Sequence, residues 1–401
     1  MTVIQDAGHT SSIAHVELYD PLYHSPQPDL YEIYRRMRDE HPVYHNADRD
    51  VWCLSRFADV QAAARDWQTF SNADGVVLDA PAQFFGPGDF LESDPPRHDV
   101  LRKVARPFFL PKEIARLEQQ VDARVAELIE RLVDQQRIDI ARDFAWPLPI
   151  WIICRLLGVP PEDDALVHRL VTDLETRYPG DTAPRKEARS ALRELISYAE
   201  DLARHKRRAP RDDLVSRLIA GEAEDEPRRD EIPGIVVLLL TAGSVTTASL
   251  IGNTLFLLAE HPDVQDMLRG GLTDIQAVIE ESLRIESPVQ YLARLTTKPA
   301  SVHGIEIPEG ADVILIWGSA NRDERHFERP DVFDVQRRKQ RNLTFGEGIH
   351  FCLGAPLARL EARIAVPAFL NAFTSYEIGG SIERFFNHTV RGFAQLPATV
   401  R

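Results

Sequence analysis

Residues 345–354 read Phe-Gly-Glu-Gly-Ile-His-Phe-Cys-Leu-Gly and place Cys352 at the end of a glycine-rich turn. The residues that follow, 355–361, read Ala-Pro-Leu-Ala-Arg-Leu-Glu and predict the start of a helix. Gly346, Gly348 and Gly354 allow a positive φ or a close approach of the backbone to a flat ligand. Amides and the helix dipole favour a thiolate at a helix N-terminus. This stretch therefore predicts an anionic sulfur held against a metal.

The other cysteines have no such surroundings. A lone cysteine is more often a small buried hydrophobe than a ligand, and we interpret Cys53 and Cys154 in this way. Zinc and iron–sulfur sites need several cysteines or histidines at short spacing, and the chain has three cysteines with no Cys-x-x-Cys pair. A single thiolate bound to the iron of a haem remains.

Residues 345–354 resemble the haem-binding signature of the cytochrome P450 family, Phe-x-x-Gly-x-x-x-Cys-x-Gly, at every fixed position, in a form that looks bacterial. The resemblance extends roughly over residues 42–397. It implies haem b as the cofactor, with Cys352 as the iron ligand and Phe345, Gly346 and Gly354 around it. It also implies a mainly α fold with small β-sheets (α+β), a triangular α-rich domain around a buried haem.

The composition is that of a globular protein and excludes several classes. The 401 residues are 44% hydrophobic and 27% charged, and we expect a single domain over 1–401 with β-rich parts at about 43–60 and 289–317. A net charge of −15 argues against nucleic acid or an anionic membrane as a partner. No apolar run follows a basic start, so we expect neither a signal sequence nor a membrane anchor, and a cytoplasmic protein. The sequence contains no Gly-x-Gly-x-x-Gly fingerprint, so we expect no fused reductase domain.

Hydrophobic periodicity gives a helix-rich pattern with short strands. The predicted helices span 30–41, 111–137, 147–157, 161–177, 181–208 and 274–284, and one further helix carries His98 and Arg102. The predicted strands span 43–44 paired with 51–54, 289–296, 302–307 and 312–317. Prolines and glycines make 76–90 a long loop, and charge density makes 207–231 a solvated connection.

Residues 232–259 contain no charged residue and no histidine. About 20 apolar residues suffice to cross a bilayer. The hydroxyl residues in the middle of the segment and the otherwise soluble pattern favour a helix through the protein core instead.

The family resemblance assigns further residues to the cofactor. The sequence Asp94-Pro95-Pro96-x-His98-x-x-x-Arg102 resembles the segment whose histidine and arginine contact a haem propionate. Arg294 and His350 are the other expected propionate contacts, because two buried carboxylates need several donors. Glu281, Arg284 and Arg337 resemble the Glu-x-x-Arg motif and its later arginine, to which we assign a structural role in holding the cysteine loop.

Ala242, Gly243 and Thr246 resemble the oxygen-activation motif, in which small residues loosen a helix and the threonine stabilises bound oxygen and passes protons. The position before Thr246, normally acidic, is Val245, which cannot supply a proton. Three explanations remain open: protons arrive through water, hydroxyls such as Ser244 or the substrate; the enzyme accepts hydrogen peroxide directly; or the residue is engineered. We favour the first explanation and expect slower or leakier turnover.

The resemblance implies a monooxygenase that uses O2 and electrons from NAD(P)H, delivered by an iron–sulfur ferredoxin and its reductase, to hydroxylate, O-dealkylate or epoxidise a hydrophobic small molecule. A peroxide-driven haem peroxygenase and a haem-based ligand-binding or sensor protein are the alternatives. Basic residues could steer the acidic ferredoxin; they are Arg102, Lys103, Arg106, Arg337, Arg338, Lys339 and Arg341. The expected substrate contacts are apolar; they are Phe84, Phe85, Leu238, Leu239, Val289, Leu292 and Val390.

Overall fold

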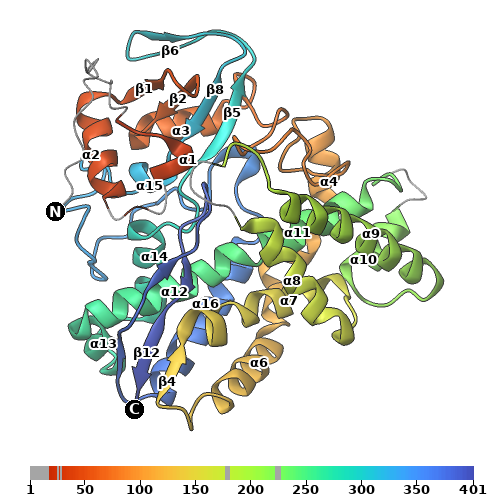
Figure 1. Cartoon of the computed structure of the whole chain (residues 1–401), viewed down its shortest axis with the longest axis vertical. Helices are drawn as coiled ribbons and strands as arrows, with labels where there is room; N and C mark the ends of the chain where they lie inside the picture. Colours follow the sequence, from red (N-terminus) through yellow and green to blue (C-terminus); the bar gives the residue numbers. More distant parts are fainter. Residues whose placement is uncertain (1–17, 25–26, 28, 177–180, 222–226) are drawn as a thin grey trace, which may run out of the picture.

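The structure is a computed structural model of the chain that describes residues 18–24, 27, 29–176, 181–221 and 227–401. Helices fill most of the molecule, and a five-stranded sheet lies at one end, at the top of Figure 1. The helices are α1 (Pro21–His24), α2 (Leu30–Glu40), α3 (Phe57–Arg65), α4 (Arg97–Ala105), α5 (Pro111–Ala115), α6 (Glu118–Glu130), α7 (Pro147–Leu157), α8 (Asp164–Glu175), α9 (Lys186–Arg208), α10 (Leu214–Gly221), α11 (Ile232–Ala242), α12 (Val245–Glu260), α13 (Pro262–Arg269), α14 (Ile275–Ile285), α15 (Trp317–Ala320) and α16 (Ala355–Ala372).

The five-stranded sheet joins the two halves of the chain. Its order is β1-β2-β8-β5-β3, formed by β1 (Val43–Asn46), β2 (Val51–Leu54), β8 (Asp312–Leu315), β5 (Leu292–Thr296) and β3 (Phe70–Ser71). The predicted hairpin β1–β2 is confirmed, and β2 pairs in parallel with β8. Smaller sheets contain the remaining strands, β4 (Arg137–Asp139), β6 (Ala300–Val302), β7 (Ile305–Ile307), β9 (Tyr376–Ile378), β10 (Glu383–Arg384), β11 (Phe393–Gln395) and β12 (Pro397–Val400).

Several predicted elements were wrong in detail. Helix α9 begins at Lys186 and not at 181, and strand β5 begins at Leu292 and not at 289. Residues 111–137 form α5 and α6 followed by β4, because Arg137 pairs with the C-terminal strand β12. Residues 302–307 form a hairpin with β6, because His303 and Gly304 turn the chain with positive φ. Trp317 begins α15 instead of ending β8. The connection 207–231 contains α10, whose Leu214 and Leu218 are fully buried.

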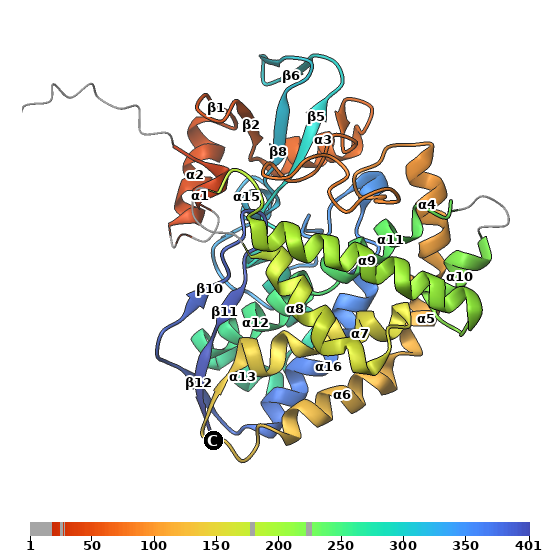
Figure 2. The same ribbon diagram turned by 45° about the vertical axis from the view of Figure 1, so that its right-hand side comes forward.

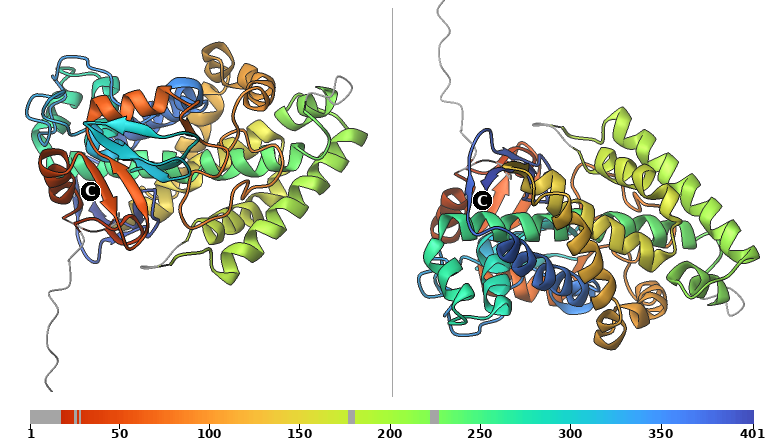
Figure 3. Two further views of the ribbon diagram at one scale, coloured as in Figure 1. Left: turned by 90° about the horizontal axis from the view of Figure 1, so that it is seen from above. Right: turned by 90° about the horizontal axis from the view of Figure 1, so that it is seen from below.

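The uncharged segment runs through the middle of the protein as α11 and α12, which cross the molecule in Figure 3. It is not one regular helix, because Gly243 and Ser244 form a turn between the two parts. In the described part of the chain, only Ile232–Glu260 is long and apolar enough to cross a membrane, and 83% of its most apolar window is buried. Its burial confirms a helix through the core. Helix α16 packs against α12 and α14, while α9 lies along α11 and α8 (Figure 2).

The predicted loop 76–90 is confirmed, since it contains no helix or strand. It lies directly on the start of α11: a Cβ atom at Gly234 would overlap the carbonyl oxygen of Pro87, and one at Gly88 would overlap that of Glu231. Glu231 is itself buried and paired with Arg97 of α4. The loop and α11 therefore meet in backbone contact beside the central cavity, and the ion pair of Arg97 with Glu231 joins α4 to them.

Candidate active site

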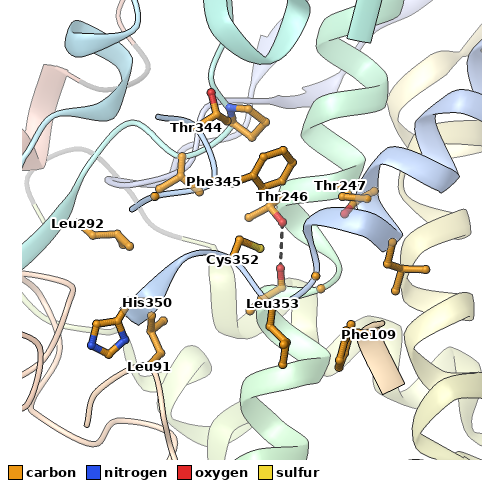
Figure 4. A pocket seen from close by; sticks show the side chains of 18 of the residues that line it. Leu91, Phe109, Thr246, Thr247, Leu292, Thr344, Phe345, His350, Cys352 and Leu353 are labelled. Atoms are coloured by element: carbon orange, nitrogen blue, oxygen red, sulfur yellow. Dashed lines mark hydrogen bonds between the residues drawn. The ribbon is translucent and has the colours of Figure 1, made fainter. Parts of the chain in front are cut away.

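A large cavity lies between α4, α11, α12, β5 and the start of α16, and its walls bring together residues from across the sequence (Figure 4). It encloses about 1350 Å³ of space without protein atoms, part of which opens to solvent. Cys352 and Thr246 both line it. Most other side chains in the wall are apolar, so the cavity suits a flat, largely hydrophobic group together with an organic molecule.

The cysteine loop holds its shape through its own backbone. The amide of Cys352 donates to the carbonyl of Phe345 at 2.8 Å, which closes the loop. Gly346 and Gly348 have φ values of 71° and 70°, in the left-handed region that favours glycine. A Cβ at Gly348 would approach the carbonyl oxygen of Ala64 to 2.6 Å, so the loop also lies tightly against α3.

Gly354 serves a different purpose from these two glycines. Its φ is −79°, so it needs no left-handed conformation. A Cβ there would lie 3.9 Å from the sulfur of Cys352, and the absence of a side chain leaves the space beside that sulfur open. The amides of Gly354 and Ala355 donate hydrogen bonds toward the sulfur. Burial raises the pKa of the Cys352 thiol, while these amides and Arg102 oppose that shift by stabilising the thiolate.

Next to the cysteine, the structure gathers histidines and arginines that have few partners. The rings of His98 and His350 are 4.6 Å apart, and the Nε2 atom of each is buried without a hydrogen-bond partner among the described residues. Arg294 is buried and donates to the carbonyl of its neighbour Ala293 at 2.6 Å. Arg102 donates to the carbonyl of Phe351.

The lowered pKa values of His350 and Arg294 show that positive charge in this buried cluster is unfavourable when no acceptor is present. Burial, together with the charges of Arg294, His98 and Arg102, lowers the pKa of His350 to about 2. Burial also lowers the pKa of Arg294 to about 10, although Asp94 partly opposes this shift. Buried donors without acceptors are costly. A ligand with two carboxylates would supply the missing acceptors, so this donor set fits the propionates of a haem.

Glu281, Arg284 and Arg337 form a buried ion triad at the C-terminal end of α14. Arg284 donates to both oxygens of Glu281 at 2.8 and 2.7 Å, and Arg337 reaches the same carboxylate at 3.1 Å. The triad does not touch the cysteine loop directly. The connection runs through Thr344, whose hydroxyl donates to the carbonyl of Leu283 at 2.7 Å just before the loop begins.

On the opposite wall, the break between α11 and α12 presents Ala242, Gly243 and Thr246 to the cavity. The hydroxyl of Thr246 donates to the carbonyl of Ala242 at 2.9 Å, as the dashed line in Figure 4 shows. Val245 does not line the cavity and is 1% exposed within the apolar core. The hydroxyl of Ser244 is also buried and donates to the carbonyl of Leu240 at 2.6 Å.

Of the expected substrate contacts, Leu238, Leu239, Val289 and Leu292 line the cavity. Val390 lies behind the wall, where it pairs with Val289 in an isolated β-bridge. Phe84 lines a second cavity between the 76–90 loop and α9, and Phe85 packs against Phe84 with 5.6 Å between ring centroids. Their loop turns them toward α9, so neither ring reaches the wall that holds Cys352.

Sequence reasoning missed several lining residues, namely Phe90, Leu91, Phe109, Ile153, Thr247, Leu250, Trp317 and Glu347. Glu347 lies within the motif 345–354, Phe90 lies within the predicted loop 76–90 and Leu91 follows it, and Thr247 and Leu250 follow the threonine motif. Phe109, Ile153 and Trp317 face the cavity because their helices pack around it, and nothing local in the sequence indicates that orientation.

The expected basic face is only partly exposed. Arg102 lines the cavity, and Arg337 is bound in the ion triad. Lys103, Arg106, Arg338, Lys339 and Arg341 are exposed. Arg341 also reaches Glu347 of the cysteine loop at 3.2 Å. Through this ion pair, Arg341 connects the exposed basic residues to the loop that carries Cys352.

Known proteins resemble the chain over nearly its whole length. The sequence pattern of the family described as cytochrome P450 matches residues 181–400. A putative cytochrome P450 123 of Mycobacterium tuberculosis is 36% identical over 388 residues, which cover 95% of this chain and 96% of the relative. The cytochrome P450 monooxygenase PikC of Streptomyces venezuelae is 36% identical over 391 residues, which cover 92% and 90%.

Solved structures show the same similarity. CYP109E1 from Bacillus megaterium, solved in complex with testosterone, superposes with a TM-score of 0.85 at 30% identity and covers 92% of this chain and 97% of that one. A mutant of P450 EryK in complex with erythromycin B superposes with a TM-score of 0.85 at 33% identity and covers 94% and 97%. The mainly helical architecture with small sheets is therefore confirmed.

Proposed function

The chain belongs to the cytochrome P450 family of haem monooxygenases, and we propose that it inserts one oxygen atom of O2 into a hydrophobic small organic molecule by hydroxylation, O-dealkylation or epoxidation. One observation carries this proposal: Cys352 and Thr246 line a single cavity whose remaining wall is mostly apolar. Relatives named as a monooxygenase, a hydroxylase and an epoxidase support the reaction class.

Cys352 would hold the iron of a haem b, and His98, Arg102, Arg294 and His350 would bind its propionates. When bound, the haem supplies reductive activation of O2, and its thiolate ligand favours O–O cleavage. The protein residues provide the surroundings for that chemistry. The amides of Gly354 and Ala355 stabilise charge on the sulfur, and the apolar wall excludes water and orients the substrate.

We propose that the electrons come from NAD(P)H through a separate ferredoxin and its reductase, in the cytoplasm. The exposed residues Lys103, Arg106, Arg338, Lys339 and Arg341 support this, because a basic group on a chain with net charge −15 would attract an acidic carrier. Peroxide-driven turnover is the second candidate, because Val245 leaves the usual acid position apolar.

The first test is the carbon monoxide difference spectrum of the reduced protein, followed by screening of organic compounds for a shift in the haem spin state. We expect the band of thiolate-ligated carbonyl haem and a spin shift with hydrophobic compounds. A spectrum typical of histidine ligation would contradict the assignment of Cys352.

Turnover with each oxidant then separates the candidates. Product formed with NAD(P)H, ferredoxin and reductase supports the monooxygenase and excludes a sensor without catalysis. Product formed only with hydrogen peroxide would replace the carrier-dependent proposal by the peroxygenase.

A further inference from the structure

A separate cavity, which we call the α7 cavity, lies between α6, α7 and α8, three helices that are neighbours in Figure 2. It encloses about 550 Å³ of space without protein atoms, part of which opens to solvent. Adjacent residues of α7 line the two cavities: Ile153 lines the cavity of Cys352, and Cys154 lines the α7 cavity. Helix α7 therefore contributes a wall to both cavities, which have no lining residue in common.

The wall of the α7 cavity combines apolar and polar side chains. The apolar residues are Pro147, Ile150, Trp151, Cys154 and Ala165, and the polar residues are Arg124, Asp164 and His168. Burial raises the pKa of the Cys154 thiol to about 12, so this sulfur is uncharged at neutral pH. Mostly apolar walls with a few polar groups are typical of sites for small organic molecules.

Two polar residues of this wall have nitrogens without a hydrogen-bond partner. The Nε atom of Arg124 and the Nε2 atom of His168 are buried, and neither has a partner in the part of the chain that the structure describes. Burial lowers the pKa of His168, so its ring is neutral at pH 7. The guanidinium Nε can only donate, and a neutral imidazole can donate through Nε2. A ligand with an acceptor would remove the cost of leaving these donors unpaired.

The charges around the cavity favour a negatively charged acceptor. Asp164 is paired with Arg155, so its own charge is already opposed. Arg124 is 14% exposed and binds Glu127 at 2.6 Å through Nη1. Glu127 is 45% exposed and is shared with Arg131, so it neutralises Arg124 only in part. Arg124 can therefore bind a second carboxylate through its remaining donors.

The aromatic ring of Trp151 lies beside this charge. The guanidinium groups of Arg124 and Arg155 are 5.7 and 5.6 Å from the centre of its ring. A ligand held at Arg124 thus has an aromatic surface within its reach, with Ile150 and Pro147 on the same helix. Aromatic rings pack favourably against one another. This wall suits a flat apolar group attached to the negative charge.

We propose that the α7 cavity binds a small aromatic carboxylate, at a site separate from that of the substrate. The carboxylate accepts hydrogen bonds from Arg124 and His168, and the ring packs against Trp151 and the apolar side chains. An inorganic anion would leave the apolar wall in contact with water, and a neutral aromatic molecule would leave the charge of Arg124 without a partner. The inference goes beyond the proposed function, because the site includes no residue that lines the cavity of Cys352.

The test uses the haem-loaded full chain with benzoate as the probe. Acetate lacks the ring and benzyl alcohol lacks the charge, so these two compounds test each half of the ligand. Calorimetric titration measures affinity in solution, and a crystal soaked in benzoate locates the bound molecule.

Two variants and one control test the residues of the site. Arg124→Gln removes the guanidinium, and Arg131→Gln is the matched control, because Arg131 binds the same Glu127 from an exposed position and does not line the cavity. Ala165→Phe fills the cavity from an exposed position on α8 and keeps Arg124. This second variant keeps the proposal falsifiable if Arg124→Gln does not fold.

We expect benzoate to bind the wild type with a Kd of about 1 mM or below. Acetate and benzyl alcohol should bind at least about tenfold more weakly, because each loses one kind of contact. Arg124→Gln and Ala165→Phe should each weaken benzoate binding by about tenfold or more, while Arg131→Gln leaves it unchanged. The crystal should show the carboxylate within hydrogen-bond distance of Arg124 and the ring beside Trp151.

Three results would overturn the proposal. The first is the absence of binding in solution, which would make any density in the soaked crystal binding at crystal concentration only. The second is wild-type affinity in Arg124→Gln or in Ala165→Phe. The third is benzoate found only in the cavity of Cys352. None of these results bears on the monooxygenase function, which is tested by product formation with the carriers.

Discussion

The cysteine loop, residues 345–354, and the helix break at Gly243 and Ser244 lie on opposite walls of the same cavity but acquire their shapes differently. The loop is shaped largely within itself, by the bond from Cys352 to Phe345 and by glycines with positive φ. The break also involves a distant neighbour: a Cβ at Gly243 would lie 2.9 Å from the carbonyl oxygen of Leu239 in α11 and 3.3 Å from Ile153 of α7. Single residues therefore determine the chemistry on the cysteine side, whereas packing between several elements shapes the substrate side.

Replacement of Cys352 should have the largest effect, because it removes the thiolate that we propose as the ligand of the haem iron. Cys352→Ser should reduce monooxygenase activity to background and abolish the carbonyl band of a thiolate-ligated haem, while circular dichroism keeps its helical signal. Cys53→Ala, at a fully buried cysteine outside the cavity, is the control and should keep the spectrum. A normal carbonyl band in Cys352→Ser would contradict the assignment.

The ion triad should give the next largest effect, on stability. Glu281→Gln leaves Arg284, which is 2% exposed, without its counter-charge. Breaking a buried ion pair typically costs about 3–5 kcal/mol, and urea denaturation would measure this as a lower free energy of unfolding. Glu32→Gln, which removes an exposed partner of Arg35, should change it by less than about 1 kcal/mol. Equal effects of the two substitutions would show that the triad does not stabilise the cysteine side.

The same contrast explains how much of the fold the sequence could predict. Helix α7 was predicted with its observed bounds, because Pro147 begins it and Gly158, with φ 83°, ends it. Helix α10 was missed, because the charges around it indicated a solvated connection. Lys206 and Asp213 are in fact a buried ion pair, and their pairing over distance is not visible in a local pattern.

The candidate site divides in the same way. The motif around Cys352 identified the loop because spacing and glycine content are local properties of the sequence. The direction of Phe84 could not be predicted, because it depends on how the 76–90 loop packs on α9 and α11. Thr247 escaped attention because a threonine in a helix usually bonds backward to its own helix, and only the structure shows that this one lines the cavity.

The pH dependence of the free energy of unfolding should report on Asp89, a buried residue of the loop 76–90 on the substrate side. Burial, and then the charge of Glu92, raises the pKa of Asp89 to about 7. The folded protein thus holds a proton that the unfolded chain releases near pH 4, so this contribution is complete below that pH and is lost as the pH rises to 7. The slope from this group is about −1.4 kcal/mol per pH unit. Asp89→Asn should remove it, and the exposed control Asp122→Asn should not; identical slopes in wild type and Asp89→Asn would contradict this.

A smaller effect on stability should come from the contact between the loop 76–90 and α11. Substitutions at two glycines separate the effect of packing from that of helix propensity. Gly234→Ala places a Cβ against the carbonyl of Pro87, so the loop beside Phe90 must shift. We expect a loss of about 1–3 kcal/mol from overpacking and weaker substrate-induced spin shifts. Gly252→Ala is the matched control, because its Cβ would lie 3.7 Å from Phe393 in ordinary contact, and alanine favours a helix by about 0.5–1 kcal/mol. If Gly234→Ala instead stabilised the protein as Gly252→Ala should, the loop would follow α11 without resistance, and the substrate side would be as locally determined as the cysteine side.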